Sequence, residues 1–170
     1  MSDTSGFFDL FQRSAWRLEV RPFYGPDADE FDRYQHDQPP TVEQERQRRH
    51  WLEHIAAATS DGRSVGRVLV VTAPLTPYWR WRVATGRAHA AAGEEIHLAD
   101  RAQHPELAAL TADFWLLDDA RVLLLDYDPR GMFLGRREVT DPASVADYRR
   151  QQALSRRCSV PLEAFLHVTR

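Results

Sequence analysis

Residues 113–138, DFWLLDDARVLLLDYDPRGMFLGRRE, decide the fold class because they predict three β-strands in immediate succession. Three apolar runs alternate with two turn sequences, in the order 114–117, DDAR (118–121), 122–125, DPRG (128–131) and 132–134. Aspartate, proline and glycine are the residues that tight turns prefer. The first two runs are apolar at successive positions, so both of their faces should be covered. The stretch therefore predicts an antiparallel meander at the buried centre of a sheet.

Capping residues, prolines and glycines mark the other expected elements. In chain order these are a short amphipathic helix over 6–12, an edge strand over 17–21, helices starting at Pro26 and Thr41, a buried strand over 67–72, a helix from Tyr78 to Ala92, a strand over 96–98, a helical turn over 105–110 and a helix starting at Asp141. Residues 160–168 form an apolar tail that has to pack on the rest of the protein.

No internal repeat and no low-complexity linker divides the 170 residues. We therefore expect a single α+β domain over 1–170, in which 1–62 is mainly helical and 63–170 contains the sheet. The sheet is expected to be mixed and central, to contain the meander at about 113–138, and to carry helices on both faces.

The basic residues exclude several enzyme classes, because all 22 of them are arginine. A chain without lysine has no P-loop lysine, no Schiff-base lysine and no Ser-Lys dyad. Arginine suits carboxylate and phosphate groups, so anion binding stays open. The net charge is −3, and the arginines are scattered among 25 acidic residues, which makes direct nucleic-acid binding unexpected.

The sequence predicts a cytoplasmic protein. Its single cysteine, Cys158, cannot form an internal disulfide, and no basic segment followed by an apolar run begins the chain. No stretch of about 18 apolar residues is present to cross a membrane.

The sharpest binding hypothesis concerns the segment YWRWR at 78–82, which follows a predicted buried strand and begins a helix. Ligands and anions are often bound where a strand leads into a helix N-terminus. Tyr78, Arg80, Trp81 and Arg82 could therefore form a pocket for a phosphate or carboxylate. The competing interpretation places Trp81 in the core with Trp79 partly packed, and pairs the arginines with Glu94, Glu95 or Asp113.

Asp126 is the fifth candidate ligand-binding residue. It lies in a run of otherwise buried character, so its carboxylate should either face an arginine or mark a functional pocket. The neighbouring Asp118, Asp119 and Asp128 are better explained by turn formation.

Two further patterns resemble catalytic sites, but each lacks a residue that its chemistry requires. His50 and His54 enclose Glu53 in an HxxEH string, as in inverted-motif zinc proteases, but no downstream glutamate is recognisable as a third ligand. Cys158 follows Arg156 and Arg157 but has no assignable histidine partner. No catalytic residue, metal or cofactor is therefore expected.

Several segments together resemble a family of uncharacterised actinobacterial proteins of about this length: FFDLFQRSAWRLEV (7–20), RVLVVTAPLTPYWRW (67–81), AAGEEIHLAD (91–100), DFWLLDDARVLLLDYDPRGMFLG (113–135) and VADYRRQQALSRRCSVP (145–161). The resemblance covers nearly the whole chain. Members of that family are commonly encoded beside helix-turn-helix regulators, which implies a regulatory or partner-binding role.

The second half also resembles a degenerate half of a phospholipase-D-like domain. Catalysis in that superfamily needs an HxK motif, in which histidine attacks and lysine binds phosphate. This chain has no lysine and no histidine following Leu125 in the meander. The resemblance therefore implies that the scaffold is retained and the reaction is lost.

These observations favour a non-catalytic regulatory or interaction module that binds a small anionic ligand or a partner protein, such as a helix-turn-helix regulator or a second copy of the chain. One alternative is an enzyme of unrecognised type that uses Asp126 and Arg80. The other is a zinc-dependent hydrolase at His50 and His54. An enzyme predicts a polar pocket that converges on Asp126 or Arg80, whereas an interaction module predicts an apolar surface patch.

Overall fold

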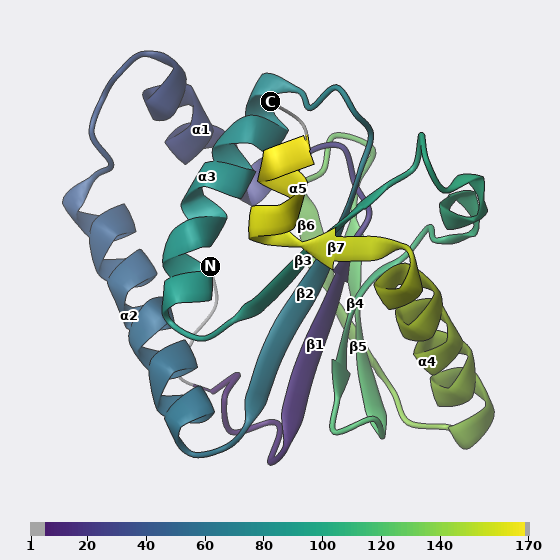
Figure 1. The fold of residues 1–170 in the computed structure, drawn as a ribbon. Coiled ribbons are helices and arrows are strands. Elements are labelled where there is room, and N and C mark those ends of the chain that lie inside the picture. The colour runs from purple at the N-terminus through teal and green to yellow at the C-terminus, as the bar shows by residue number, and fades with distance from the viewer. Residues whose placement is uncertain (1–5, 169–170) are drawn as a thin grey trace.

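A seven-stranded mixed sheet runs through the centre of the protein in the computed structural model, which describes residues 6–168 (Figure 1). Its strands are β1 (Ser14–Glu19), β2 (Ser64–Val71), β3 (Glu95–Asp100), β4 (Asp113–Leu117), β5 (Arg121–Tyr127), β6 (Phe133–Val139) and β7 (Ser159–Pro161). The spatial order is β6-β5-β4-β1-β2-β3-β7. Strands β1, β2 and β3 are parallel to one another, and every other pairing is antiparallel.

Five helices and two short 3-10 turns complete the described chain. They are η1 (Gly25–Asp27), α1 (Ala28–Gln35), α2 (Val42–Ser60), α3 (Pro77–Ala91), η2 (Pro105–Ala109), α4 (Pro142–Arg157) and α5 (Leu162–Val168). The helix starts predicted at Thr41 and Asp141 are confirmed, because both side chains accept a hydrogen bond from the first turn. Thr76 caps α3 in the same way, with proline at the first helical position.

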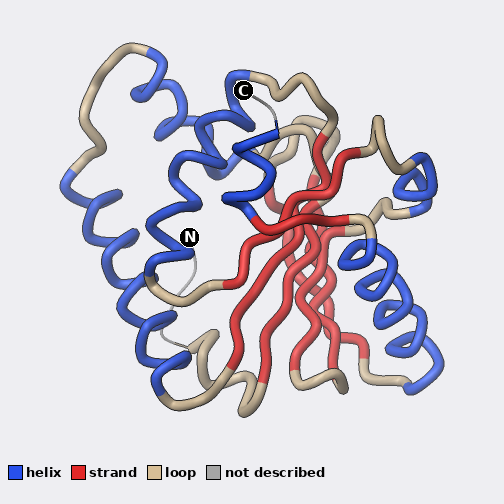
Figure 2. The backbone as a smooth tube through the Cα atoms, in the orientation of Figure 1, coloured by secondary structure: helices blue, strands red, loops and turns tan. Residues whose placement is uncertain are grey.

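Helices cover both faces of the sheet, as predicted (Figure 2). Helix α4 lies on one face, where Val145 and Tyr148 pack against Phe114 and other apolar side chains of the strands. Helices α1, α2, α3 and α5 lie on the other face (Figure 1). On that face the apolar core is split into two clusters, one under α3 and α5 and one under α2.

The prediction that residues 17–21 form an edge strand is wrong, because β1 is the middle strand and pairs with both β2 and β4. Its alternating pattern suggested a strand with one solvated face. In the structure Trp16 and Leu18 face the α4 side, while the charged Arg17 and Glu19 face the other side of the sheet and are neutralised there. The N-terminal third is therefore not only helical, because it supplies the central strand.

The stretch 113–138 does not form the centre of the sheet along its whole length. Strand β4 is fully buried beside β1, but β6 is an edge strand whose side chains are mostly exposed. The turn between β5 and β6 contains Gly131 at φ 81°, which agrees with the expected role of glycine there. Two large apolar side chains of β6, Phe133 and Leu134, face solvent.

The N-terminal aromatic segment packs on the protein itself. Residues 6–12 form turns, so the short helix predicted there is wrong. Phe7 lies 4.6 Å from Trp115 of β4, and Phe8 lies 5.0 Å from Trp51 of α2, measured between ring centroids. The segment is therefore held in place by these aromatic contacts, and its phenylalanine spacing does not reflect a helix. The apolar C-terminal tail packs as well, through β7 against β3 and through α5 against α3.

None of the described helices combines the length and the apolar character that crossing a membrane requires.

Candidate functional site

A network of buried ion pairs lies on the sheet face that α3 covers. Glu19, at the end of β1, is fully buried, and its carboxylate lies 2.8 Å from Arg67 Nη1 and 2.6 Å from Arg82 Nη2. Arg17 Nε lies 3.5 Å from the same carboxylate. Arg67 also donates from Nε to Glu94 Oε1 at 2.6 Å. Strands β1 and β2, helix α3 and the residue before β3 thus contribute charges that neutralise one another.

The carboxylates of this network stay ionised. Burial by itself would raise the pKa of Glu19, but the guanidiniums of Arg17, Arg82 and Arg67 outweigh it and hold that pKa well below its usual range. Burial at Glu94 is outweighed in the same way, so its pKa falls to about 2. A carboxylate locked in its ionised form cannot act as a general acid near neutral pH. The network therefore links β1, β2 and α3 through ionised groups, and neither carboxylate is a candidate for a general acid.

A buried tyrosine–carboxylate pair adjoins the network at the end of the parallel strands. The Tyr24 hydroxyl donates a hydrogen bond to Asp113, whose carboxylate also accepts from the backbone N–H of Val20 at 3.0 Å. Burial raises the pKa of Asp113, and it also raises the pKa of Tyr24 well above its usual range. Because the two side chains are hydrogen-bonded to each other, the network ends at this pair.

The aromatic residues predicted to stack on a ligand belong to the core. Tyr78 and Trp81 are buried and pack against Phe31 of α1, with ring centroids 5.4 and 5.5 Å away. Tyr78 also donates its hydroxyl to Asp27 Oδ2 at 2.6 Å. The competing interpretation, which placed the tryptophan in the core, agrees with the structure at Trp81.

Arg82 also forms ion pairs within the protein, but with partners that the sequence did not suggest. It pairs with Glu19, and its Nη1 lies 3.4 Å from Asp27 Oδ2. Glu94 instead pairs with Arg67, and Glu95 pairs with Arg156 at 3.2 Å. The expected pairing of the α3 arginines with Glu94, Glu95 or Asp113 is therefore wrong for Arg82, because β1 and η1 approach α3 from regions distant in the sequence.

Arg80 points away from the network, into a surface hollow of about 400 Å³ between α3, α5 and the loop after β2. The hollow is lined by Pro74, Leu75, Arg80, Val83, Ala84, Arg87 and Leu166. Residues 80, 83, 84 and 87 follow helical spacing and so share one face of α3. Arg80 donates from Nη1 to the Leu75 carbonyl at 2.8 Å, and no carboxylate of the described chain forms an ion pair with it. Arg87 Nε lies 3.3 Å from the exposed Glu163.

Asp126 lies on the opposite face of the sheet from Tyr78 and Arg82. It follows Leu124 on the face that α4 covers, and its Oδ2 accepts from Arg137 Nε at 3.0 Å on β6. The pair is partly exposed. Asp126 thus faces an arginine, one of the two outcomes that the sequence predicted, and it does not converge with Arg80.

His50 and His54 lie on a partly exposed face of α2. The ring centroids are 4.2 Å apart, and His54 Nδ1 lies 2.7 Å from the His50 carbonyl oxygen. Glu53 lies 4.0 Å from Arg49. Within residues 6–168 no third metal-ligating side chain gathers with these two histidines.

The structure does assemble one group of three metal-ligating side chains, which the sequence analysis did not identify. His104, Glu106 and Cys158 bring their ligand atoms within 4.8 Å of one another. The first two residues lie at η2 and the third ends α4, so they are more than 50 positions apart in the chain. No short spacing motif could have signalled this group, because only the packing of α4 against the loop after β3 creates it.

A family described as a domain of unknown function, DUF6879, matches residues 2–167. No curated protein is detectably similar to the chain in sequence.

Proposed function

The chain belongs to the DUF6879 family, and from this premise we propose that it is a non-catalytic binding module that takes a small anion with an apolar portion in the hollow between α3 and α5. The observation that carries the proposal is Arg80, whose guanidinium lines this hollow without a carboxylate partner in the described chain. The other arginine of α3 near the sheet, Arg82, is neutralised by Glu19 and Asp27.

The lining of the hollow defines the class of ligand. Arg80 offers a guanidinium without a carboxylate partner in the described chain, and Arg87, which forms an exposed ion pair with Glu163, adds a second guanidinium; such groups suit a carboxylate or phosphate. Leu75, Val83 and Leu166 offer apolar surface beside them. An anion with a short hydrocarbon chain would satisfy both parts, whereas a free inorganic ion would use only the first.

Calorimetric titration with octanoate, octyl phosphate, inorganic phosphate and octanol tests the proposal. We expect the two anions with a tail to bind more tightly than either inorganic phosphate or octanol, because only they use charge and apolar surface together. Arg80→Gln should weaken their binding by about tenfold or more, the value of a hydrogen bond to a charged group.

Arg49→Gln is the matched control, because Arg49 is an exposed helical arginine on α2, away from the hollow. Its binding should equal that of the wild-type protein. Equal affinity of the Arg80 and Arg49 variants for octyl phosphate, with both variants folded by circular dichroism, would refute the proposal.

The enzymatic alternatives receive less support from the geometry. Asp126 and Arg80 lie on opposite sides of the sheet and cannot act on one substrate. His50 and His54 have no third ligand within the described residues, and zinc hydrolysis needs three protein ligands and an open position.

An exposed apolar surface supports a second candidate function, the binding of a partner protein. Met132, Phe133 and Leu134 are consecutive and exposed at the start of edge strand β6. An unpaired strand edge with apolar side chains is typical of a protein contact. A helix-turn-helix regulator or a second copy of the chain is the partner that we propose for this edge.

Our proposal has three further parts. The family is actinobacterial, the module acts in the cytoplasm in a regulatory role, and the second half of the chain is a degenerate phospholipase-D-like half-domain that keeps the scaffold and has lost the reaction. The lysine-free composition supports the loss of the reaction, because the HxK motif cannot be formed.

A further inference from the structure

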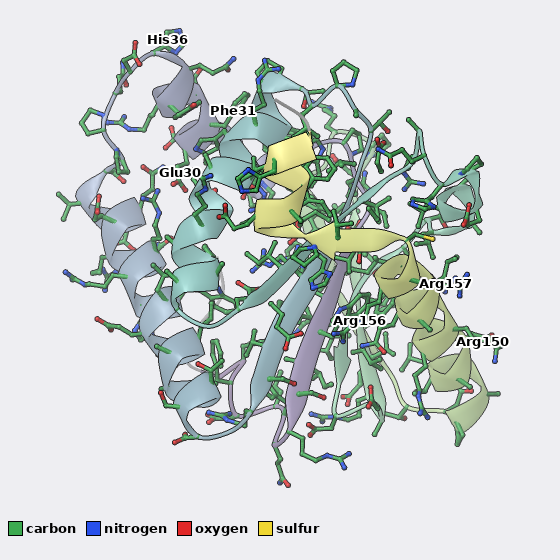
Figure 3. All side chains as sticks on the ribbon, in the orientation of Figure 1. Glu30, Phe31, His36, Arg150, Arg156 and Arg157 are labelled. Carbon is green, nitrogen blue, oxygen red and sulfur yellow. The ribbon has the colours of Figure 1, made fainter. Side chains whose placement is uncertain are left out.

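His104, Glu106 and Cys158 meet on the α4 side of the sheet, away from the hollow at Arg80. The Cys158 thiol donates to Glu106 Oε1 at 3.4 Å, and His104 Nδ1 lies 3.8 Å from the same oxygen. All three ligand atoms lie within 4.8 Å of one another. Arg157 marks the end of α4 that faces the 105–109 turn in Figure 3.

Two segments hold these side chains in place. Cys158 is the C-cap of α4, where its backbone N–H donates to the Leu154 carbonyl at 3.2 Å, and its side chain is buried with the α4-side core. His104 begins η2 and donates its backbone N–H to the Asp100 carbonyl at 3.0 Å. Leu107 of η2 is fully buried in the same core. The cysteine is therefore fixed, while His104 and Glu106 keep rotational freedom at the surface.

The spacing of the ligand atoms fits a zinc-like ion. Bond lengths of about 2.3 Å to sulfur and about 2.0–2.2 Å to nitrogen and oxygen place tetrahedral ligand atoms about 3.4–3.6 Å apart. The sulfur–oxygen distance of 3.4 Å already matches, and the nitrogen–oxygen distance of 3.8 Å is slightly longer. Rotation of the half-exposed His104 side chain can shorten the remaining separations.

We propose that His104, Glu106 and Cys158 form a binding site for a borderline divalent transition metal such as Zn²⁺, with the fourth position open to water or a ligand. Imidazole and thiolate together select this class of metal over Mg²⁺ and Ca²⁺, which prefer oxygen donors. Three protein ligands and one open position are the pattern of zinc sites that bind an exchangeable group. Such an ion would also join the end of α4 to the η2 turn.

The alternative is that the thiol only donates a hydrogen bond to the glutamate. Burial raises the pKa of Cys158, and the Glu106 carboxylate raises it further, so the metal-free thiol is protonated near neutral pH. Metal binding would displace this proton, because the thiolate is the ligand. The two situations therefore differ in the state of the only thiol in the chain, which makes that thiol a direct reporter.

The test uses full-length protein treated with a chelator, followed by equilibrium dialysis against Zn²⁺ and against Co²⁺. The double variant His50→Gln/His54→Gln serves as the parent, because the exposed histidine pair of α2 could bind metal on its own. We expect about one equivalent of bound metal, thiolate-to-cobalt charge-transfer absorption, and protection of Cys158 from a thiol-modifying reagent by Zn²⁺.

Glu106→Gln and His104→Gln, made in the same parent, should weaken binding by at least about tenfold, since loss of even outer-shell partners costs that much. Both side chains are partly exposed, so these variants should fold, and circular dichroism checks it. The proposal is overturned if the parent binds no metal, if bound cobalt shows no thiolate absorption, or if neither variant changes the affinity. Because the hollow lies elsewhere, octyl phosphate binding is independent of each of these results.

Discussion

Glu94 is the residue whose titration most directly reports on the buried charge network. Its carboxylate is bonded to Arg67 Nε and lies 3.0 Å from His89 Nδ1. Its pKa is lowered from 4.5 to about 2 because these partners outweigh the effect of burial. A group with a depressed folded-state pKa stabilises the protein above its unfolded-state pKa, and the stabilisation is lost as pH falls toward the folded-state value.

We therefore expect the free energy of unfolding to decrease as pH is lowered from about 4.5 to about 2, by about 3 kcal/mol from Glu94. Glu19 acts in the same direction, because its pKa is also lowered. Asp113 acts in the opposite direction, because burial raises its pKa. Urea denaturation of wild-type and Glu94→Gln proteins across this range measures the effect.

The Glu94→Gln variant should be much less stable than wild type at pH 7, and the difference should shrink as pH falls from 4.5 toward 2, because the carboxylate becomes protonated in the unfolded chain while it stays ionised in the folded protein. Glu95→Gln is the control, because Glu95 is the next residue and forms an exposed ion pair with Arg156. A constant difference between wild type and the Glu94 variant from pH 7 to pH 2 would show that the network does not hold this charge.

The turn between β5 and β6 shows at the element scale why a loop conformation depends on one glycine. Gly131 has φ 81°, and its carbonyl accepts the backbone N–H of Gly25 at 2.7 Å. A Cβ atom at position 131 would lie 2.7 Å from the Phe23 carbonyl oxygen. The turn is thus hydrogen-bonded to the loop after β1, and that loop lies too close to position 131 to leave room for a side chain there.

Gly131→Ala should lower the free energy of unfolding more than Gly62→Ala. Gly62 has a similar φ of 80° but open space around its Cβ position, so its variant carries only the backbone strain, about 1 kcal/mol. The free energy of unfolding of the Gly131 variant should fall by a further 1–3 kcal/mol, roughly, because the added Cβ overpacks the contact with Phe23. Equal losses in thermal or urea denaturation would mean that the loop moves aside without cost.

At the scale of the whole molecule, the exposed edge of the sheet is where association between molecules is expected. Three of the six large apolar side chains exposed in the described chain are consecutive, at Met132, Phe133 and Leu134. They adjoin the unpaired edge of β6. We expect self-association at high protein concentration in sedimentation experiments, because edge strands with exposed apolar side chains pair readily.

Leu134→Glu should abolish this self-association without lowering stability, since its side chain is 69% exposed. Val42→Glu is the control, because Val42 is 88% exposed but lies at the start of α2 and not on β6. Association that persists in the Leu134 variant, or that disappears in the Val42 variant, would assign the contact to another surface.

Most elements of the fold could be predicted from local signals, and the errors occurred where partners are distant in sequence. The caps at Thr41, Thr76 and Asp141 act within one helical turn, so they are visible in the sequence. Strand β1 was misplaced at an edge because its alternation of apolar and charged residues is also the pattern of a strand with a solvated face. Of the predicted ligand-binding residues, only Arg80 lies at the hollow.

The sequence by itself determined the α+β class, the starts of α2, α3 and α4 and the absence of lysine chemistry, because these depend on neighbouring residues or on composition alone. Tertiary structure decided that Arg82 is neutralised while Arg80 has no carboxylate partner in the described chain, and that His104 and Glu106 meet Cys158. These outcomes depend on how strands and helices from distant parts of the chain pack together. A buried charge is neutralised, and a set of metal ligands is assembled, only by side chains from another part of the chain. No local sequence pattern specifies which residues those are.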